Sequence, residues 1–200
     1  MNRVIACLSV LLFAGGCASN APVPEDRFYR LAEVQPGHAL ERPLLTGGLA
    51  VEHVVADPLR SGRAIVYGES AEPLQLRRYH YEFWVDQPPR MVQQALQSWL
   101  RASGVADSVA GSEDDAAAWR LSARLLKFDE MRAGGGAAHV EVAMQFSLSS
   151  ATSNRPLWVR DYAQQRAVAG QDMAATAQAM QSALTGLFAD LQADLAIPAL

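Results

Sequence analysis

Residues 138–149 read AHVEVAMQFSLS, and this stretch decides the fold that the sequence predicts. Large apolar side chains alternate with polar or small ones, which is the period of a β-strand with one buried and one open face. The apolar positions are Val140, Val142, Met144, Phe146 and Leu148. A sheet with a single buried face needs one covering layer, and a helix packed on it can supply that layer completely.

A long predicted helix near the C-terminus can form this layer. Over residues 172–195, apolar side chains recur every three or four positions, so one side of the helix is apolar. Asp172 is placed to cap its N-terminus. Such a stripe could also pair with a second helix in a coiled coil, but closing a single domain is the more common role.

The segments on either side of residues 138–149 complete a meander. Residues 119–131 predict a strand whose alternation slips near Leu125-Leu126, which indicates a β-bulge. Residues 157–169 predict a returning strand with a polar outer face. The polar side chains of that face are Arg160, Gln164 and Arg166.

The N-terminal half predicts further strands and one more helix. Pro88-Pro89 favours the first turn of a helix, and Ser103-Gly104 favours its end. The predicted strands cover residues 27–34, 49–56, 63–67, 74–85 and 105–110. The whole pattern predicts one α/β (α+β) domain over residues 27–200, with a mixed, mostly antiparallel β-sheet and two main helices packed on it.

The predicted strand over residues 74–85 is dense in aromatic side chains. Alternation places Tyr79, Tyr81, Phe83 and Val85 on one face, and His80, Glu82 and Trp84 on the other. Aromatic rows can stack the bases of nucleic acids, but a basic groove normally accompanies them and this chain is acidic. Packing in a core or an interface is therefore the favoured interpretation.

The N-terminus has the pattern of an export signal. Leu11-Leu-Phe-Ala-Gly-Gly-Cys17 ends an apolar run that is too short to span a membrane. Small residues directly before a cysteine are typical of bacterial lipoproteins, in which acyl chains such as palmitate are attached at that cysteine. We therefore expect a signal peptide over residues 1–16, and a lipidated Cys17 with a tether over residues 17–26. The alternative is an ordinary secretory signal followed by an unrelated cysteine.

Charge and cysteine content exclude several classes of protein. The chain has 17 Lys and Arg against 21 Asp and Glu, and loss of Arg3 with the signal would leave 16 against 21, a net charge of −5. A mildly acidic domain lacks the electrostatic footprint of a nucleic-acid-binding protein. With Cys7 in the signal and Cys17 lipidated, the mature domain has no thiol for a disulfide or a cysteine metal site.

The sequence carries no recognisable catalytic or cofactor motif. It contains no Gly-x-Ser-x-Gly elbow, no His-Glu-x-x-His and no phosphate-binding loop. The acidic loop at residues 113–115 lacks the alternating ligand spacing of a calcium site. The histidines, which do not occur at ligand spacing, are His38, His53, His80 and His139. These features predict a protein that is not an enzyme and holds no cofactor or metal.

Several short stretches, in this order and spacing, are similar to a known family. Besides the cysteine, they are FYRL at residues 28–31, RAIVY at residues 63–67, and LRRYHYEFW at residues 76–84 with Pro88-Pro89 behind. On these residues the chain resembles the ABC-type transport auxiliary lipoproteins, which include the paraquat-inducible protein C-like outer-membrane lipoproteins. The resemblance spans nearly the whole mature chain.

The resemblance implies an auxiliary or docking role in a transport system that moves lipids between the inner and outer membranes. The implied partners are a periplasmic protein with mammalian-cell-entry domains and an inner-membrane ABC permease and ATPase. It also implies a lipid anchor at the periplasmic face of the outer membrane, and it allows a homo-oligomeric ring. Ala18-Ser19 agrees with that location, because inner-membrane lipoproteins tend to carry Asp after the cysteine.

A docking protein acts through its surface, where Arg, Tyr and Trp are favoured as interface hot spots. The candidate partner-binding residues are Arg77, Arg78, Tyr79, Tyr81 and Trp84, together with the polar face of the strand over residues 157–169. The alternative is a lipid carrier or chaperone, which needs an apolar cavity of several hundred Å³. The single buried face of residues 138–149 favours a filled interior and therefore a docking role.

Overall fold

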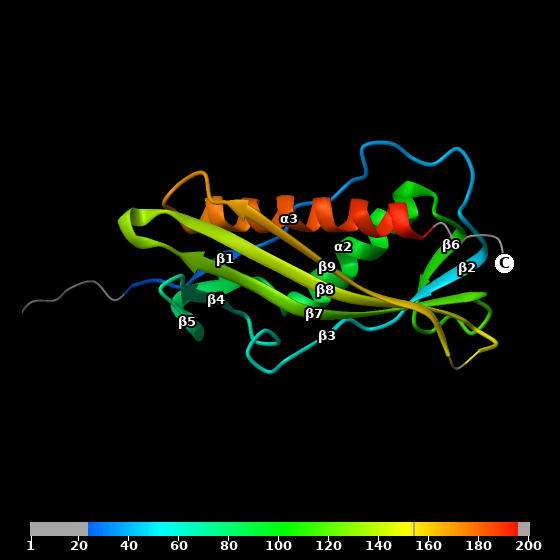
Figure 1. Ribbon diagram of the computed structural model, residues 1–200, viewed down its shortest axis with the longest axis horizontal. Helices are drawn as coiled ribbons and strands as arrows, with labels where there is room; N and C mark the ends of the chain where they lie inside the picture. The colour runs from blue at the N-terminus through cyan, green and yellow to red at the C-terminus, as the bar shows by residue number, and fades with distance from the viewer. Residues whose placement is uncertain (1–23, 154, 196–200) are drawn as a thin grey trace, which may run out of the picture.

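The computed structural model of the chain describes residues 24–153 and 155–195, so Cys17 and the predicted signal lie outside the described residues. Nine strands form one mixed sheet, and two long helices pack on it (Figure 1), which confirms the predicted α+β domain. No helix in the described part of the chain is long and apolar enough to cross a bilayer. The strands are β1 (Arg27–Tyr29), β2 (Leu45–Val51), β3 (Val55–Ala56), β4 (Ala64–Glu69), β5 (Glu72–Trp84), β6 (Ala106–Gly111), β7 (Trp119–Arg132), β8 (Ala138–Ser150) and β9 (Pro156–Ala167).

Strand β7 is the central strand of the sheet, with paired strands along both of its edges. Along one edge it pairs antiparallel with β8 over its whole length, and β9 then pairs antiparallel with β8. Along the other edge it takes β2, β3 and β4 one after another, each of them parallel. Strand β6 adds to β2, while β5 and then β1 add to β4. One long strand therefore joins a β1–β5 end of the molecule to a β2–β6 end (Figure 1).

Helices α2 (Pro88–Ser103) and α3 (Met173–Asp194) bury the apolar face of the sheet. The five alternating apolar side chains of β8 are all 0 % exposed, which confirms the buried face predicted from residues 138–149. The side chains of α3 that meet this face are equally buried, and they include Met180, Leu184, Leu187, Phe188 and Leu191. The core is thus continuous from the sheet to the helix layer.

The ends of both helices follow the local signals in the sequence. Helix α2 begins at Pro88, and Gly104 ends it in the left-handed conformation with φ of 66°, where a side chain would be strained. Asp172 caps α3, because its Oδ1 accepts a hydrogen bond of 2.8 Å from the backbone N–H of Ala175. These predicted boundaries are confirmed.

Most strand ends differ from the prediction by a few residues, and two predicted strands are shortened or divided, whereas the β7 bulge agrees with the prediction. The β7–β8 register shifts between Leu125 and Lys127, which confirms the bulge. The first strand stops at Tyr29, because residues 30–34 leave the sheet and the Ala32 N–H donates to Gln181 of α3. The strand predicted over residues 49–56 is split into β2 and β3, since the intervening backbone turns toward Gln93 of α2.

The polar face predicted to lie outward on β9 instead lies toward α3. Arg160 forms an ion pair of 2.6 Å with Asp194, and the Gln164 amide donates to Asp190 at 2.6 Å. Polar side chains fit there because α3 presents carboxylates along the side that borders β9. The outward face of β9 carries Leu157 and Val159, which are 43 % and 50 % exposed.

Candidate interaction surfaces

The predicted contact segment lies on β5, and part of it reaches the surface. Arg77, Arg78 and Tyr81 are exposed. Trp84 is only 1 % exposed, and its ring packs against Phe128 with the ring centroids 5.2 Å apart. The expectation that Trp84 contacts a partner is therefore wrong, because this side chain belongs to the core.

A register shift between β4 and β5 changes the faces that were predicted for the aromatic residues. Ala64 pairs with Phe83, whereas Val66 pairs with Arg78, so a short piece of β4 is matched by a longer piece of β5. Strict alternation cannot continue through the extra residues. As a result, Tyr79 and Glu82 line the same pocket, although the sequence pattern placed them on opposite faces.

This pocket, which we call the α3 pocket, lies between β5, the end of β7 and the start of α3, and has a volume of about 710 Å³. The Tyr79 hydroxyl donates to Glu130, and the Thr176 hydroxyl donates to the same carboxylate at 3.0 Å. Burial and the neighbouring Glu130 carboxylate raise the pKa of Tyr79 well above its ordinary value. Tyr79 therefore serves an internal hydrogen bond and is not a free contact residue.

The sequence prediction missed Glu130 and Thr176, which are 6 % and 1 % exposed. After the β7 bulge, Glu130 pairs with Val140 and so shares the buried face of β8. The available signal was the bulge itself, because a slip of one residue exchanges the two faces of a strand.

A second buried carboxylate ties the first strand to the sheet. Arg27 forms an ion pair with Glu82, which is directly opposite it in the β1–β5 ladder. Burial and the nearby Glu82 carboxylate raise the pKa of Tyr29. The other oxygen of Glu82 is buried and has no hydrogen-bond partner among the described residues. These contacts fix β1, and with it the place where the chain enters the domain.

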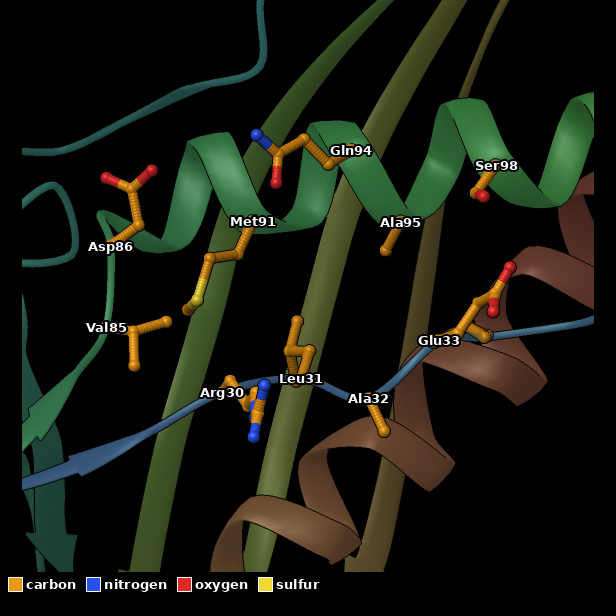
Figure 2. A pocket seen from close by; sticks show the side chains of 11 residues that line it. Arg30, Leu31, Ala32, Glu33, Val85, Asp86, Met91, Gln94, Ala95 and Ser98 are labelled. Atoms are coloured by element: carbon orange, nitrogen blue, oxygen red, sulfur yellow. The ribbon is translucent and has the colours of Figure 1, made fainter.

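A groove of about 420 Å³ runs between α2 and the extended segment of residues 30–34 (Figure 2). Figure 2 shows Met91 and Ala95 pointing from α2 toward Leu31, with polar side chains along the rim. The rim residues are Arg30, Glu33, Asp86, Gln94 and Ser98. The groove is open along the surface, so its shape suits contact with another molecule better than enclosure of a lipid.

An exposed aromatic patch lies at the β1–β5 edge, on the face of the sheet that is turned away from α2 and α3. Phe28 is 53 % exposed and stacks on Phe83, with the centroids 5.8 Å apart and the rings inclined by 30°. The Arg63 guanidinium lies 5.2 Å from the centre of the Phe28 ring, and its Nε donates to the Trp84 carbonyl at 3.1 Å. We call Phe28, Phe83 and Arg63 the aromatic patch. The sequence prediction did not select it, because its members come from three separate strands or loops.

Comparison with protein families identifies the chain. Residues 29–192 match the model of a family described as the ABC-type transport auxiliary lipoprotein component. The chain belongs to this family. The auxiliary lipoprotein family is the one that the sequence resembled, so that prediction is confirmed, and the family name associates the protein with an ABC transport system.

Solved structures show that the fold of this auxiliary lipoprotein occurs elsewhere. Protein XCC0632 from Xanthomonas campestris, assigned to the DUF330 family, is 20 % identical with a TM-score of 0.73, over 83 % of this chain and 92 % of that one. The crystal structure of an uncharacterised protein is 15 % identical with a TM-score of 0.64, over 86 % of this chain and 99 % of that one. No curated protein sequence matches the chain significantly.

Two histidines of the auxiliary lipoprotein make local contacts with neighbouring side chains. His53 lies 3.4 Å from the Gln93 side chain, and His139 lies 3.6 Å from Glu141. The acidic loop contributes Asp115 to a 3.7 Å ion pair with Arg120. Within residues 24–153 and 155–195, no three His, Cys, Asp or Glu side chains are grouped to hold a metal ion.

Proposed function

We propose that this auxiliary lipoprotein is a non-catalytic docking component, anchored through Cys17 at the periplasmic face of the outer membrane. The proposal includes cleavage after residue 16 and a tether over residues 17–26 that leads into the domain of residues 27–200. In it, the domain holds a periplasmic protein with mammalian-cell-entry domains, which connects to an inner-membrane ABC permease and ATPase that move lipids.

The filled interior is the observation that carries a docking role rather than a carrier role. The apolar face of β8 and the facing side of α3 are 0 % exposed and pack directly against each other. A carrier needs an enclosed apolar space of several hundred Å³. The α3 pocket has carboxylates, arginines and hydroxyls among its lining residues beside small apolar ones, and the groove beside α2 is open, so neither has the character of an enclosed acyl-chain cavity.

Two buried carboxylates, Glu130 and Asp129, support a structural role in the same way. Glu130 receives hydroxyl hydrogen bonds from Tyr79 and Thr176, and Asp129 receives the guanidinium of Arg60. Carboxylates that accept hydrogen bonds from internal partners, as these two do, hold the fold together and are not poised around a substrate. Function then resides on the surface, and we propose that Arg77, Arg78 and Tyr81 contribute contacts to the partner.

The anchor and the partner are tested together in cells that express the full-length protein. The wild-type protein should fractionate with outer membranes, and Cys17→Ser should give a folded domain that does not. Cross-linking followed by mass spectrometry should recover a protein with mammalian-cell-entry domains from wild type, and less of it from the triple variant Arg77→Glu, Arg78→Glu, Tyr81→Ser. Unchanged membrane association of Cys17→Ser would contradict the anchor.

The lipid-carrier alternative makes a different prediction for the purified protein. A docking protein should yield no stoichiometric lipid by native mass spectrometry once detergent is removed, apart from its covalent acyl chains. One phospholipid retained per domain, and lost on replacement of core residues under α3, would favour the carrier role instead.

A further inference from the structure

The aromatic patch is exposed in a way that needs an explanation. Phe28 lies on an edge strand, more than half of its surface is open, and its inner side already stacks on Phe83. Phe83 pairs with Phe28 on one side and with Ala64, the neighbour of Arg63, on the other. Phe28, Phe83 and Ala64 therefore share the face of the sheet that is turned away from α2 and α3. Aromatic rings grouped on an open face usually mark a contact surface.

The position of the patch in the chain indicates what covers it. Phe28 is 11 residues after Cys17 in the sequence. Fully extended, that length of chain reaches at most about 38 Å, so a lipid attached at Cys17 keeps the β1 end of the domain near the bilayer. This step rests on the lipid anchor of the proposed function.

The chemistry of the patch also fits a lipid surface. A ring beside a guanidinium is suited to the interface of a bilayer, where the ring contacts the acyl boundary and the cation meets phosphate groups. Arg63 has no ion-pair partner among the described residues, whereas Arg27 is paired with Glu82. The nearby carboxylates Glu25 and Asp26 are exposed on the chain segment that leads to the anchor.

We propose that the aromatic patch of Phe28, Phe83 and Arg63 rests on the phospholipid surface and gives the auxiliary lipoprotein a second, non-covalent membrane contact. Acyl chains alone leave a tethered domain free to rotate. A ring and a cation at the base of the tether fix one face toward the lipid, because two membrane signals act together. The opposite end, with β2, β6 and the start of β9, then points away from the membrane.

The test uses the full-length, acylated protein reconstituted in vesicles of phosphatidylethanolamine and phosphatidylglycerol. A fluorophore on Asp26→Cys, an exposed position two residues before Phe28 and on the same side of the extended chain, reports contact with lipids that carry a quencher in their headgroup region. Phe28→Ser should lower this quenching about fivefold, because loss of a ring from an apolar contact weakens the contact by roughly that factor or more. The matched control is Val159→Ser, which changes an equally exposed side chain at the far end and should leave quenching unchanged.

A second variant tests the contact independently, in case Phe28→Ser does not fold. Arg63→Gln should lower quenching in vesicles with phosphatidylglycerol, and much less in vesicles of phosphatidylcholine alone, because it removes a cation that meets anionic headgroups. Circular dichroism and thermal unfolding verify that the variants are folded.

The outcomes separate the patch from the anchor. Protein that floats with the vesicles but shows no quenching, or equal quenching in wild type and Phe28→Ser, overturns the membrane contact. The membrane contact is also overturned if quenching of the label requires a second copy of the chain or a partner protein. Protein that does not float with vesicles at all refutes the lipid anchor and the patch contact together.

Discussion

A buried ion pair fastens the loop between β3 and β4 to the sheet, and its removal should destabilise the domain strongly. Asp129 of β7 is 2 % exposed. Its carboxylate accepts a hydrogen bond of 3.0 Å from Nε of Arg60, and it pairs with a second guanidinium nitrogen of the same residue. The remaining nitrogen of Arg60 lies 2.6 Å from Asp57. We consider Arg60→Met, which keeps the length of the side chain and removes its charge.

Arg60→Met leaves Asp129 buried without a cation. Removing one partner of a buried pair typically costs about 3–5 kcal/mol, because the other charge loses its compensation. A change of this size lowers the melting temperature of a domain of this length by about 6–20 °C. The double variant Arg60→Met, Asp129→Leu should recover much of the loss, since no buried charge remains.

The dependence on pH gives an independent check. Burial raises the pKa of Asp129, although hydrogen bonds from Arg60 oppose the rise. Without Arg60, the folded protein should favour protonated Asp129 still more. A carboxyl whose pKa is higher in the folded state contributes stability at low pH that is lost as the pH rises. The cost of Arg60→Met should therefore be smaller at pH 5 than at pH 7.5.

Urea unfolding of the four proteins of this double-mutant cycle, at both pH values, measures these quantities. Lys127→Met is the control, because Lys127 makes a 2.7 Å ion pair with Glu141 but is half exposed, and such pairs contribute at most about 1 kcal/mol. An Arg60→Met variant that loses no more than this control would refute the reasoning. So would a double variant that is less stable than either single variant.

Two further predictions concern α3. Leu184→Ala, at a position that is 0 % exposed, should lower the free energy of unfolding by about 2–5 kcal/mol in urea titrations; a loss below about 1 kcal/mol would reveal unfilled space under the helix. Burial and the Asp194 carboxylate raise the pKa of Tyr162 to about 12, so its proton stabilises the fold below pH 10 and this contribution is lost toward pH 12. Unfolding free energies of wild type and Tyr162→Phe should converge over that range, and a constant difference would contradict the assignment.

Local signals in the sequence predicted much of this fold. The alternation of residues 138–149 gave the correct buried face of β8, because both neighbours of β8 are strands joined to it by short turns. The ends of α2 and α3 followed Pro88, Gly104 and Asp172, whose effects depend on the backbone within one turn.

The errors lie where distant segments decide the outcome. The faces of β5 depend on the register shift against β4, and the direction of Arg160 and Gln164 depends on the carboxylates of α3. Neither the register shift nor the carboxylates of α3 can be read from the sequence of the strand that they affect. The aromatic patch was missed for the same reason, since Arg63 precedes β4 while Phe28 and Phe83 lie on other strands.

The position of β7 as the central strand of the sheet has a consequence for the order of folding. During synthesis the segments of β2, β3 and β4 leave the ribosome long before β7, the strand to which all three pair. The β7–β8–β9 meander, in contrast, closes through contacts between neighbours in the chain, which form quickly. In pulsed hydrogen exchange, the meander should therefore acquire protected amides before β2 and β3 do, while the β4–β5 hairpin forms locally and keeps the edge that later pairs with β7 open until β7 arrives.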